Sequence, residues 1–201
     1  MEVKTIAVIG AETVGRVVAF IAAVSGYDTV LEDVSEERLE KAASWITQNL
    51  EPSVARGNLG AQGGDAADAR FSLAHTVEDA IRGADLIIET LPDEMEMQVE
   101  LFTILDKFAK PNAIFATTGK LSVTELAEVT FCADRCIGMR FPENIEGTKV
   151  VELVRGSDTS LETIAACDEV ARRMGREVMV LEDRAVYKFS ERERKFVNAQ
   201  D

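Results

Sequence analysis

A hexapeptide bounded by glycines, GAETVG (residues 10–15), lies between an apolar run, VKTIAVI, and a second apolar run, RVVAFIAAVSG. This placement is typical of a turn that binds the pyrophosphate of a dinucleotide, for which the pattern is G-x-G-x-x-G. Glu12 replaces the middle glycine and brings bulk and a like charge towards two phosphates. At ~5 Å and an effective dielectric of about 20, one such repulsion costs about 3 kcal/mol, which is more than a hundredfold in affinity.

The same carboxylate suits a helix N-terminus, where free N–H groups and the helix dipole attract negative charge. We therefore predict that Glu12 takes the place of phosphate in the empty loop. Asp33 ends the next apolar segment, 23 residues after Gly10, where an acid binds the ribose hydroxyls of NAD. The loop residues expected to contact this cofactor are Gly10, Ala11, Glu12, Thr13, Val14 and Gly15.

Strand-like and helix-like segments alternate along the whole chain. The predicted strands are 3–9, 28–33, 69–74, 84–89, 113–118, 136–141, 150–155 and 177–183, and the predicted helices are 13–25, 36–50, 77–83, 93–109, 122–129 and 160–175. Residues 55–69, rich in glycine and alanine, are predicted to form a mobile connection. The alternation predicts a Rossmann-type α/β fold, a doubly wound and mostly parallel sheet, in a single domain over residues 1–183. Residues 184–201 form a short, charged tail that we expect to be helical.

Composition excludes several classes of function. The net charge of −14 argues against nucleic acid and anionic membranes as partners. There is no apolar run of about 18 residues and no signal-peptide pattern at the N-terminus, so we expect a cytoplasmic protein. Cys132, Cys136, Cys167 and the single histidine, His75, lack metal-ligand spacing. No metal site is therefore predicted.

Longer stretches of the chain resemble the NAD-binding domain of short-chain 3-hydroxyacyl-CoA dehydrogenases. The matching stretches, in the family's order and spacing, are IAVIGAETVG, LEDVSEERLEKA, GADLIIETLPDEMEMQVELF, LSVTELAEVT, RCIGMRF, KVVELVRGSDTS and VMVLEDR. The resemblance implies NAD as cofactor, an acyl-CoA or small keto acid as substrate, and a role in fatty acid metabolism. Family members continue into a helical domain that forms the dimer and closes the active site, and this chain is too short to contain it. We therefore expect a homo-oligomer or association with a partner chain.

The resemblance also places the site residues, and most of them differ from the family. The family's cofactor-contacting glutamate and lysine after the fourth strand match Asp93 and Gln98. The S-N-T-S-S turn matches residues 116–120, so Thr117 lies where the family has its asparagine and Gly119 lies where it has its substrate-contacting serine. These replacements predict weakened contacts with both cofactor and substrate.

The catalytic pair is altered as well. The family's general-base histidine matches Arg140, and the glutamate that orients the histidine matches Glu152. Arginine stays protonated and has no acceptor, so Arg140 cannot be the base. Its guanidinium could instead stabilise an alkoxide during ketone reduction, or clamp a carboxylate. Alternatively, Arg140 forms a salt bridge with Glu152 in an inactive site, which we favour because the cofactor contacts have changed in parallel.

Two functions therefore remain open. One is a 3-hydroxyacyl-CoA dehydrogenase-like oxidoreductase with a degraded active site. The other is a non-catalytic binding or assembly module with weak or no NAD binding.

Overall fold

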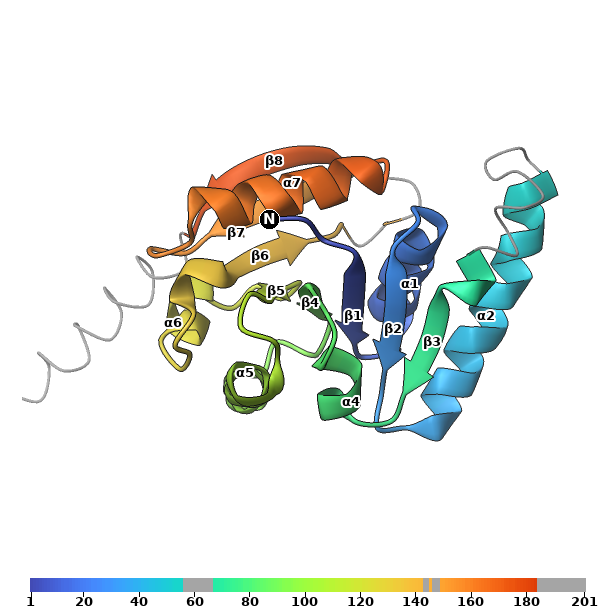
Figure 1. The fold of residues 1–201 in the computed structure, drawn as a ribbon, viewed down its shortest axis with the longest axis horizontal. Helices are drawn as coiled ribbons and strands as arrows, with labels where there is room; N and C mark the ends of the chain where they lie inside the picture. Colours follow the sequence, from blue (N-terminus) through green and yellow to red (C-terminus); the bar gives the residue numbers. More distant parts are fainter. Residues whose placement is uncertain (56–66, 143–144, 146–148, 184–201) are drawn as a thin grey trace, which may run out of the picture.

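The computed structural model describes residues 1–55, 67–142, 145 and 149–183 (Figure 1). Over these ranges the chain forms one eight-stranded sheet in the order β3-β2-β1-β4-β5-β6-β7-β8. The strands are β1 (Thr5–Ile9), β2 (Asp28–Glu32), β3 (Phe71–Ala74), β4 (Leu86–Glu89), β5 (Ile114–Thr117), β6 (Cys136–Arg140), β7 (Val150–Arg155) and β8 (Glu177–Glu182). Neighbouring strands run parallel except β6 and β7, which are antiparallel. The predicted mostly parallel, Rossmann-type sheet is confirmed.

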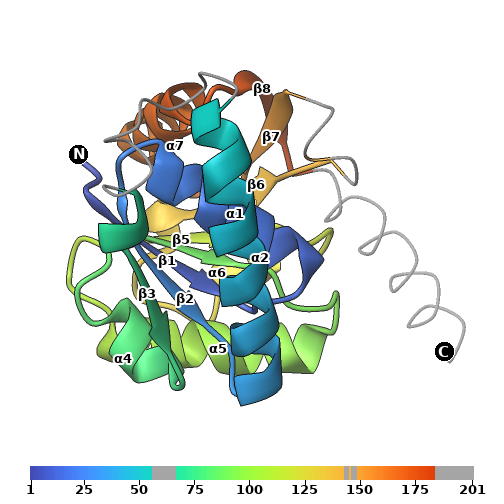
Figure 2. The same cartoon turned by 90° about the vertical axis from the view of Figure 1, so that its right-hand side faces the viewer.

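Helices cover both faces of the sheet. They are α1 (Thr13–Val24), α2 (Glu36–Ala55), α4 (Val77–Ile81), α5 (Met95–Phe108), α6 (Val123–Ala127) and α7 (Leu161–Arg173), with a 3₁₀ turn at Ala133–Arg135. One apolar core joins the sheet to α1, α2 and α7, and a second core joins it to α4, α5 and α6. In Figure 2, α4 and α5 lie below the strands and α7 lies above them.

The central strand shows why the sequence folds in this way. Ile6 and Val8 of β1 belong to one core, and Ala7 and Ile9 belong to the other. Successive side chains of a strand point to opposite faces, so a strand covered on both sides must be apolar throughout. The uninterrupted apolar run of residues 6–9 is the direct consequence.

The predicted elements agree with the structure to within a few residues at their ends. The largest difference is α2, which continues to Ala55 instead of ending at residue 50. Most of the predicted mobile connection (residues 56–66) and the predicted tail (residues 184–201) lie outside the described residues. Among the helices in the described ranges, none is both long and apolar enough to cross a membrane.

Candidate functional site

A cavity of about 580 Å³ opens at the carboxyl ends of β1, β2 and β4. Its walls come from the segments that follow these strands and from α2, α4 and α5. The order of the strands reverses here, because β1 lies between β2 on one side and β4 on the other. Open α/β sheets bind their ligands in the crevice at such a switch point.

The two glycines of the hexapeptide are both required by close packing. Gly10 has a φ of +98°, a left-handed conformation that side chains disfavour. A Cβ on Gly15 would lie 1.8 Å from the carbonyl oxygen of Gly10, and 2.8 Å from Oγ1 of Thr90 after β4. The turn that brings α1 against the end of β1 therefore exists only with glycine at these positions.

Glu12 does not take the place of phosphate, and this prediction is wrong. It precedes α1, but its carboxylate caps none of the N–H groups in the first turn. The side chain is 68% exposed and lies 3.7 Å from Nε of Arg38 on α2. Because solvent and Arg38 both compensate its charge, Glu12 leaves the helix N-terminus accessible to an anion.

Asp33 holds the glycine turn in place. Its Oδ2 accepts a hydrogen bond from the backbone N–H of Ala11 at 3.0 Å, and its Oδ1 accepts one from Ser35 at 2.9 Å. Arg38 lies beside it, with Nη1 3.5 Å from Oδ2. Each carboxylate oxygen has a second lone pair, so Asp33 can still accept from ribose hydroxyls while it fixes the loop. The proximity of Arg38 was not foreseen from the sequence.

The predicted salt bridge between Arg140 and Glu152 is not formed. The two residues are direct partners across β6 and β7, yet no ion pair joins them. Instead, Arg140 donates from Nε to the carbonyl of Gly119 at 2.8 Å and from Nη2 to that of Leu121 at 3.3 Å. The guanidinium thus fixes the loop between β5 and α6, whose carbonyls have no strand partner at this point.

A second buried acid, Glu89, lies at the end of β4. It is fully buried, and it accepts hydrogen bonds from the hydroxyl of Thr117 and from the backbone N–H of Leu91 at 2.8 Å. Burial raises the pKa of Glu89 to about 7, although these two hydrogen bonds act in the opposite direction. Thr117, expected near the substrate, is thus engaged within the protein.

Asp93 and Gln98 are also engaged internally and do not line the cavity. Gln98 is fully buried and donates to the carbonyl of Pro92 at 3.2 Å. Asp93 accepts a hydrogen bond from the backbone N–H of Lys120 at 2.7 Å. A Cβ on Gly119 would lie only 2.4 Å from Oδ1 of Asp93. The glycine at 119 and the aspartate at 93 therefore belong to one coordinated packing arrangement.

Two buried acids at the ends of strands were not identified as site residues from the sequence. Glu32 and Glu89 are the last residues of β2 and β4, and both are almost completely buried. The available signal was an acid that ends each of two apolar runs, VLE and LIIE. Within the part of the chain that is described, no group of three or more His, Cys, Asp and Glu side chains could hold a metal ion.

The fold and the glycine turn define a dinucleotide-binding domain of the Rossmann type. The chain belongs to the family described as "3-hydroxyacyl-CoA dehydrogenase, NAD binding domain", whose model matches residues 5–184.

Similar proteins agree with this assignment. A 3-hydroxybutyryl-CoA dehydrogenase of Bradyrhizobium diazoefficiens is 35% identical over 182 residues, which cover 90% of this chain and 62% of that protein. A probable 3-hydroxybutyryl-CoA dehydrogenase of Bacillus subtilis is 33% identical, over 91% of this chain and 64% of that protein. The crystal structure of 3-hydroxybutyryl-CoA dehydrogenase from Escherichia coli K12 matches with a TM-score of 0.86 at 29% identity, over 91% of this chain and 39% of that one. The chain thus spans less than two thirds of the length of these relatives.

Proposed function

We propose that this chain is an NAD-binding domain of the 3-hydroxyacyl-CoA dehydrogenase type whose own residues do not complete the catalytic site. The observation that carries this proposal is the position of Arg140. Its guanidinium donates hydrogen bonds to two loop carbonyls. By the chain's resemblance to the family, this position corresponds to that of the general base. A permanently protonated group in that position cannot accept the proton of a 3-hydroxyl group.

The cofactor half of the proposal rests on the fit of the crevice. The glycine turn leaves the N-terminus of α1 open to a pyrophosphate, and Asp33 lies where it can accept from the ribose of the adenosine half. The adjoining cavity has room for a base. NAD, when bound, would supply the hydride acceptor, while the protein would supply only binding and orientation.

Catalysis in a larger assembly is the second candidate. The relatives continue beyond the region that this chain matches. A further copy or a partner chain that supplies the equivalent of this remaining part would close the site, and an acyl-CoA or a small keto acid would be the substrate in fatty acid metabolism. Arg140 would then act as an electrophile towards a ketone oxygen, which requires it to leave at least one loop carbonyl. The cytoplasm is the proposed compartment, because Cys132, Cys136 and Cys167 are buried free thiols.

Binding and turnover can be measured separately. Isothermal titration with NADH should show binding to the wild-type chain, and acetoacetyl-CoA with NADH should give no loss of NADH absorbance. Turnover by the isolated chain would contradict the inactive site, and the absence of NADH binding at millimolar ligand would contradict the cofactor half. Light scattering at several protein concentrations tests self-association, and a monomer throughout would leave only the partner-chain form of the second candidate.

A further inference from the structure

Glu32 is a buried acid whose carboxyl group accepts no hydrogen bond from the described residues. It is 2% exposed, it lines the cavity at the end of β2, and its Oε1 has no hydrogen-bond partner among the described residues. Most buried polar groups are bonded, and an unpaired one costs stability. Glu89, the equivalent acid at the end of β4, has partners on both oxygens. A buried carboxyl group without a partner, on a residue that lines a cavity, points to a ligand that supplies the partner.

The remainder of the cavity fits a flat, mostly apolar ring. Val34, Val77, Leu91, Leu101 and Ile104 contribute apolar walls. Small-molecule sites are commonly built in this way, with apolar walls and a few polar groups that fix the orientation.

The order of groups along the crevice places this ring. The pyrophosphate is expected at the N-terminus of α1, and the ribose is expected at Asp33. Val30 of β2 packs against the core beside α4, α5 and α6, and Glu32, two residues further along the same strand, points to the same face of the sheet. Glu32 therefore faces the α4 and α5 side of the cavity, beyond the ribose position, where the base of the nucleotide would lie.

We infer that Glu32, in its neutral acid form, recognises the adenine ring: its O–H donates to a ring nitrogen and its C=O accepts the N6–H. A protonated carboxyl group carries a donor and an acceptor side by side, as an Asn or Gln amide does when it pairs with adenine. This inference rests on the proposed binding of NAD and adds a residue that selects the base.

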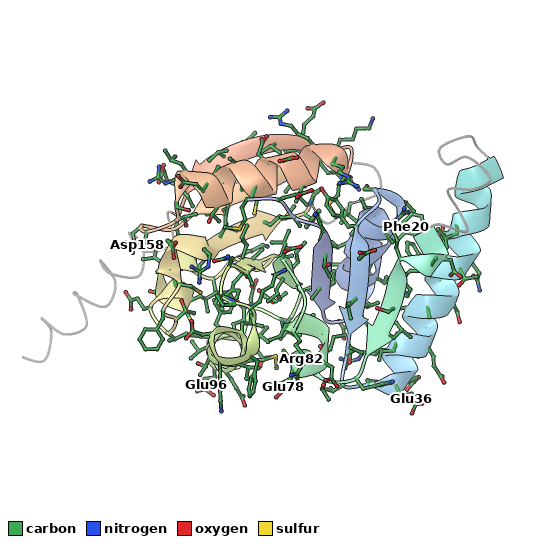
Figure 3. The ribbon with its side chains drawn as sticks, viewed as in Figure 1. Phe20, Glu36, Glu78, Arg82, Glu96 and Asp158 are labelled. Carbon is green, nitrogen blue, oxygen red and sulfur yellow. The ribbon has the colours of Figure 1, made fainter. Side chains whose placement is uncertain are left out.

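The charges around Glu32 favour the neutral form. Burial, together with the smaller effect of the negative charges of Asp33 and Glu78, raises the pKa of Glu32 to about 7. The charged groups from the elements around the cavity are Glu12 before α1, Arg38 on α2, Asp33 after β2, Glu78 on α4 and Glu100 on α5. Figure 3 shows two further acids, Glu36 and Glu96, and one cation, Arg82, on the side of the molecule where β1, β2 and β3 end. An ionised Glu32 would lose its donor and would add one more negative charge near the diphosphate.

The base-selection test uses NAD⁺ and its 1,N6-etheno derivative, in which the N6–H donor is absent. Isothermal titration at pH 6 should show that the wild-type chain binds NAD⁺ roughly tenfold more tightly than the etheno derivative, as two net hydrogen bonds would give. Glu32→Leu should bind the two ligands with nearly equal affinity. Glu32→Gln should keep the preference, because its amide offers the same donor and acceptor.

The pH dependence provides a second readout. Between pH 6 and pH 8, NAD⁺ binding by the wild-type chain should weaken by up to about tenfold as Glu32 releases its proton. Glu32→Gln should lose this dependence, although it keeps every other titratable group, including His75. The matched control is Glu96→Gln, which removes one negative charge from an exposed position on α5 that does not line the cavity, and it should keep both the base preference and the pH dependence.

The outcomes separate the inference from the proposed function. If the wild-type chain binds NAD⁺ and the etheno derivative equally, or if its affinity stays constant from pH 6 to pH 8, the role of Glu32 is overturned while NAD binding stands. If wild type, Glu32→Gln and Glu32→Leu all bind neither ligand at millimolar concentration, NAD binding and the role of Glu32 are both overturned. Thermal unfolding of each variant shows whether the change has preserved the fold.

Discussion

The two ends of the crevice use their polar groups in opposite ways. At the ends of β1 and β2, the glycine turn is open, a cavity of about 580 Å³ is present, and Glu32 has an unbonded carboxyl oxygen. At the ends of β4, β5 and β6, the polar groups bond to one another: Arg140 to loop carbonyls, and Thr117 to Glu89. The first region retains space and bonding capacity for a ligand, whereas the second has used its capacity within the protein.

Under the proposed function, the cofactor-binding part and the catalytic part of the crevice differ from the family to different degrees. Binding of adenosine needs a glycine turn, an acid and an apolar cavity, and the structure has all three. Catalysis needs a group that can accept a proton beside the substrate, and Arg140 cannot do this. The variants below test the contrast, from the largest expected effect to the smallest.

Gly15→Ala should have the largest effect. Its new Cβ would overlap the carbonyl oxygen of Gly10, a backbone atom that cannot move away without opening the turn. We expect the free energy of unfolding to fall by about 3 kcal/mol, and NADH binding to be lost. Gly119→Ala is the matched control in the other region, because its Cβ would meet side-chain atoms, Oδ1 of Asp93 and Nε2 of Gln98, and no backbone atom as close as the carbonyl that opposes Gly15. Urea denaturation should show a smaller loss for Gly119→Ala, and equal losses would contradict the contrast.

The two buried acids should respond in opposite directions to replacement by leucine. At pH 8, Glu32→Leu should be more stable than wild type by about 2 kcal/mol, since it removes an unpaired buried carboxylate. Glu89→Leu should be less stable, because Thr117 and the N–H of Leu91 lose their acceptor.

The pH dependence of the free energy of unfolding tests the raised pKa values of Glu32 and Glu89. Each acid has a folded-state pKa of about 7, above the ordinary value of 4.5. The folded state therefore holds protons that the unfolded state releases, and stability that is fully present below pH 4.5 is lost as the pH rises through about 7. Urea denaturation from pH 4.5 to pH 8 should show a shallower decline in Glu32→Leu. An unchanged slope would contradict the raised pKa of Glu32.

Arg140→Met should affect stability but not nucleotide binding. It leaves the carbonyls of Gly119 and Leu121 without their donor, at a cost of about 1.5 kcal/mol. Thermal unfolding measures the loss, and NADH titration should give the wild-type affinity. A change in NADH affinity without a change in stability would show that Arg140 contacts the cofactor instead of supporting the loop.

Glu12→Gly should have the smallest effect. A carboxylate fixed beside the pyrophosphate would cost more than a hundredfold in affinity, but Glu12 is mostly exposed and lies beside Arg38. We expect NADH to bind less than about tenfold more tightly to Glu12→Gly than to wild type. Arg38→Gln, which removes the compensating charge, should enlarge the effect of Glu12→Gly in a double-mutant cycle. A hundredfold gain in the single variant would show that Glu12 turns towards the phosphates.

Much of the fold could be predicted because local patterns carry it. Apolar runs of strand length alternate with amphipathic segments, and a sheet covered on both faces requires this arrangement. The glycine turn could also be located, since only Gly10 and Gly15 allow its backbone. Glu12 could be found as a departure from the glycine pattern, whereas Arg140 could be found only through the family that the chain resembles.

The hydrogen-bond and ion-pair partners of the charged groups could not be predicted from the sequence. Arg140 and Glu152 are opposite each other in the sheet, yet the arginine turns to a loop that arrives from β5. Glu12 pairs with Arg38 across the gap between two helices, and Glu32 and Glu89 end similar apolar runs with and without partners. Sequence alone determined the order of strands and helices and placed Gly10, Gly15 and Asp33 at the crevice, because backbone geometry and burial are periodic along the chain. Only the tertiary structure decided what each charge bonds to, because those contacts join segments whose approach depends on the packing of the whole sheet.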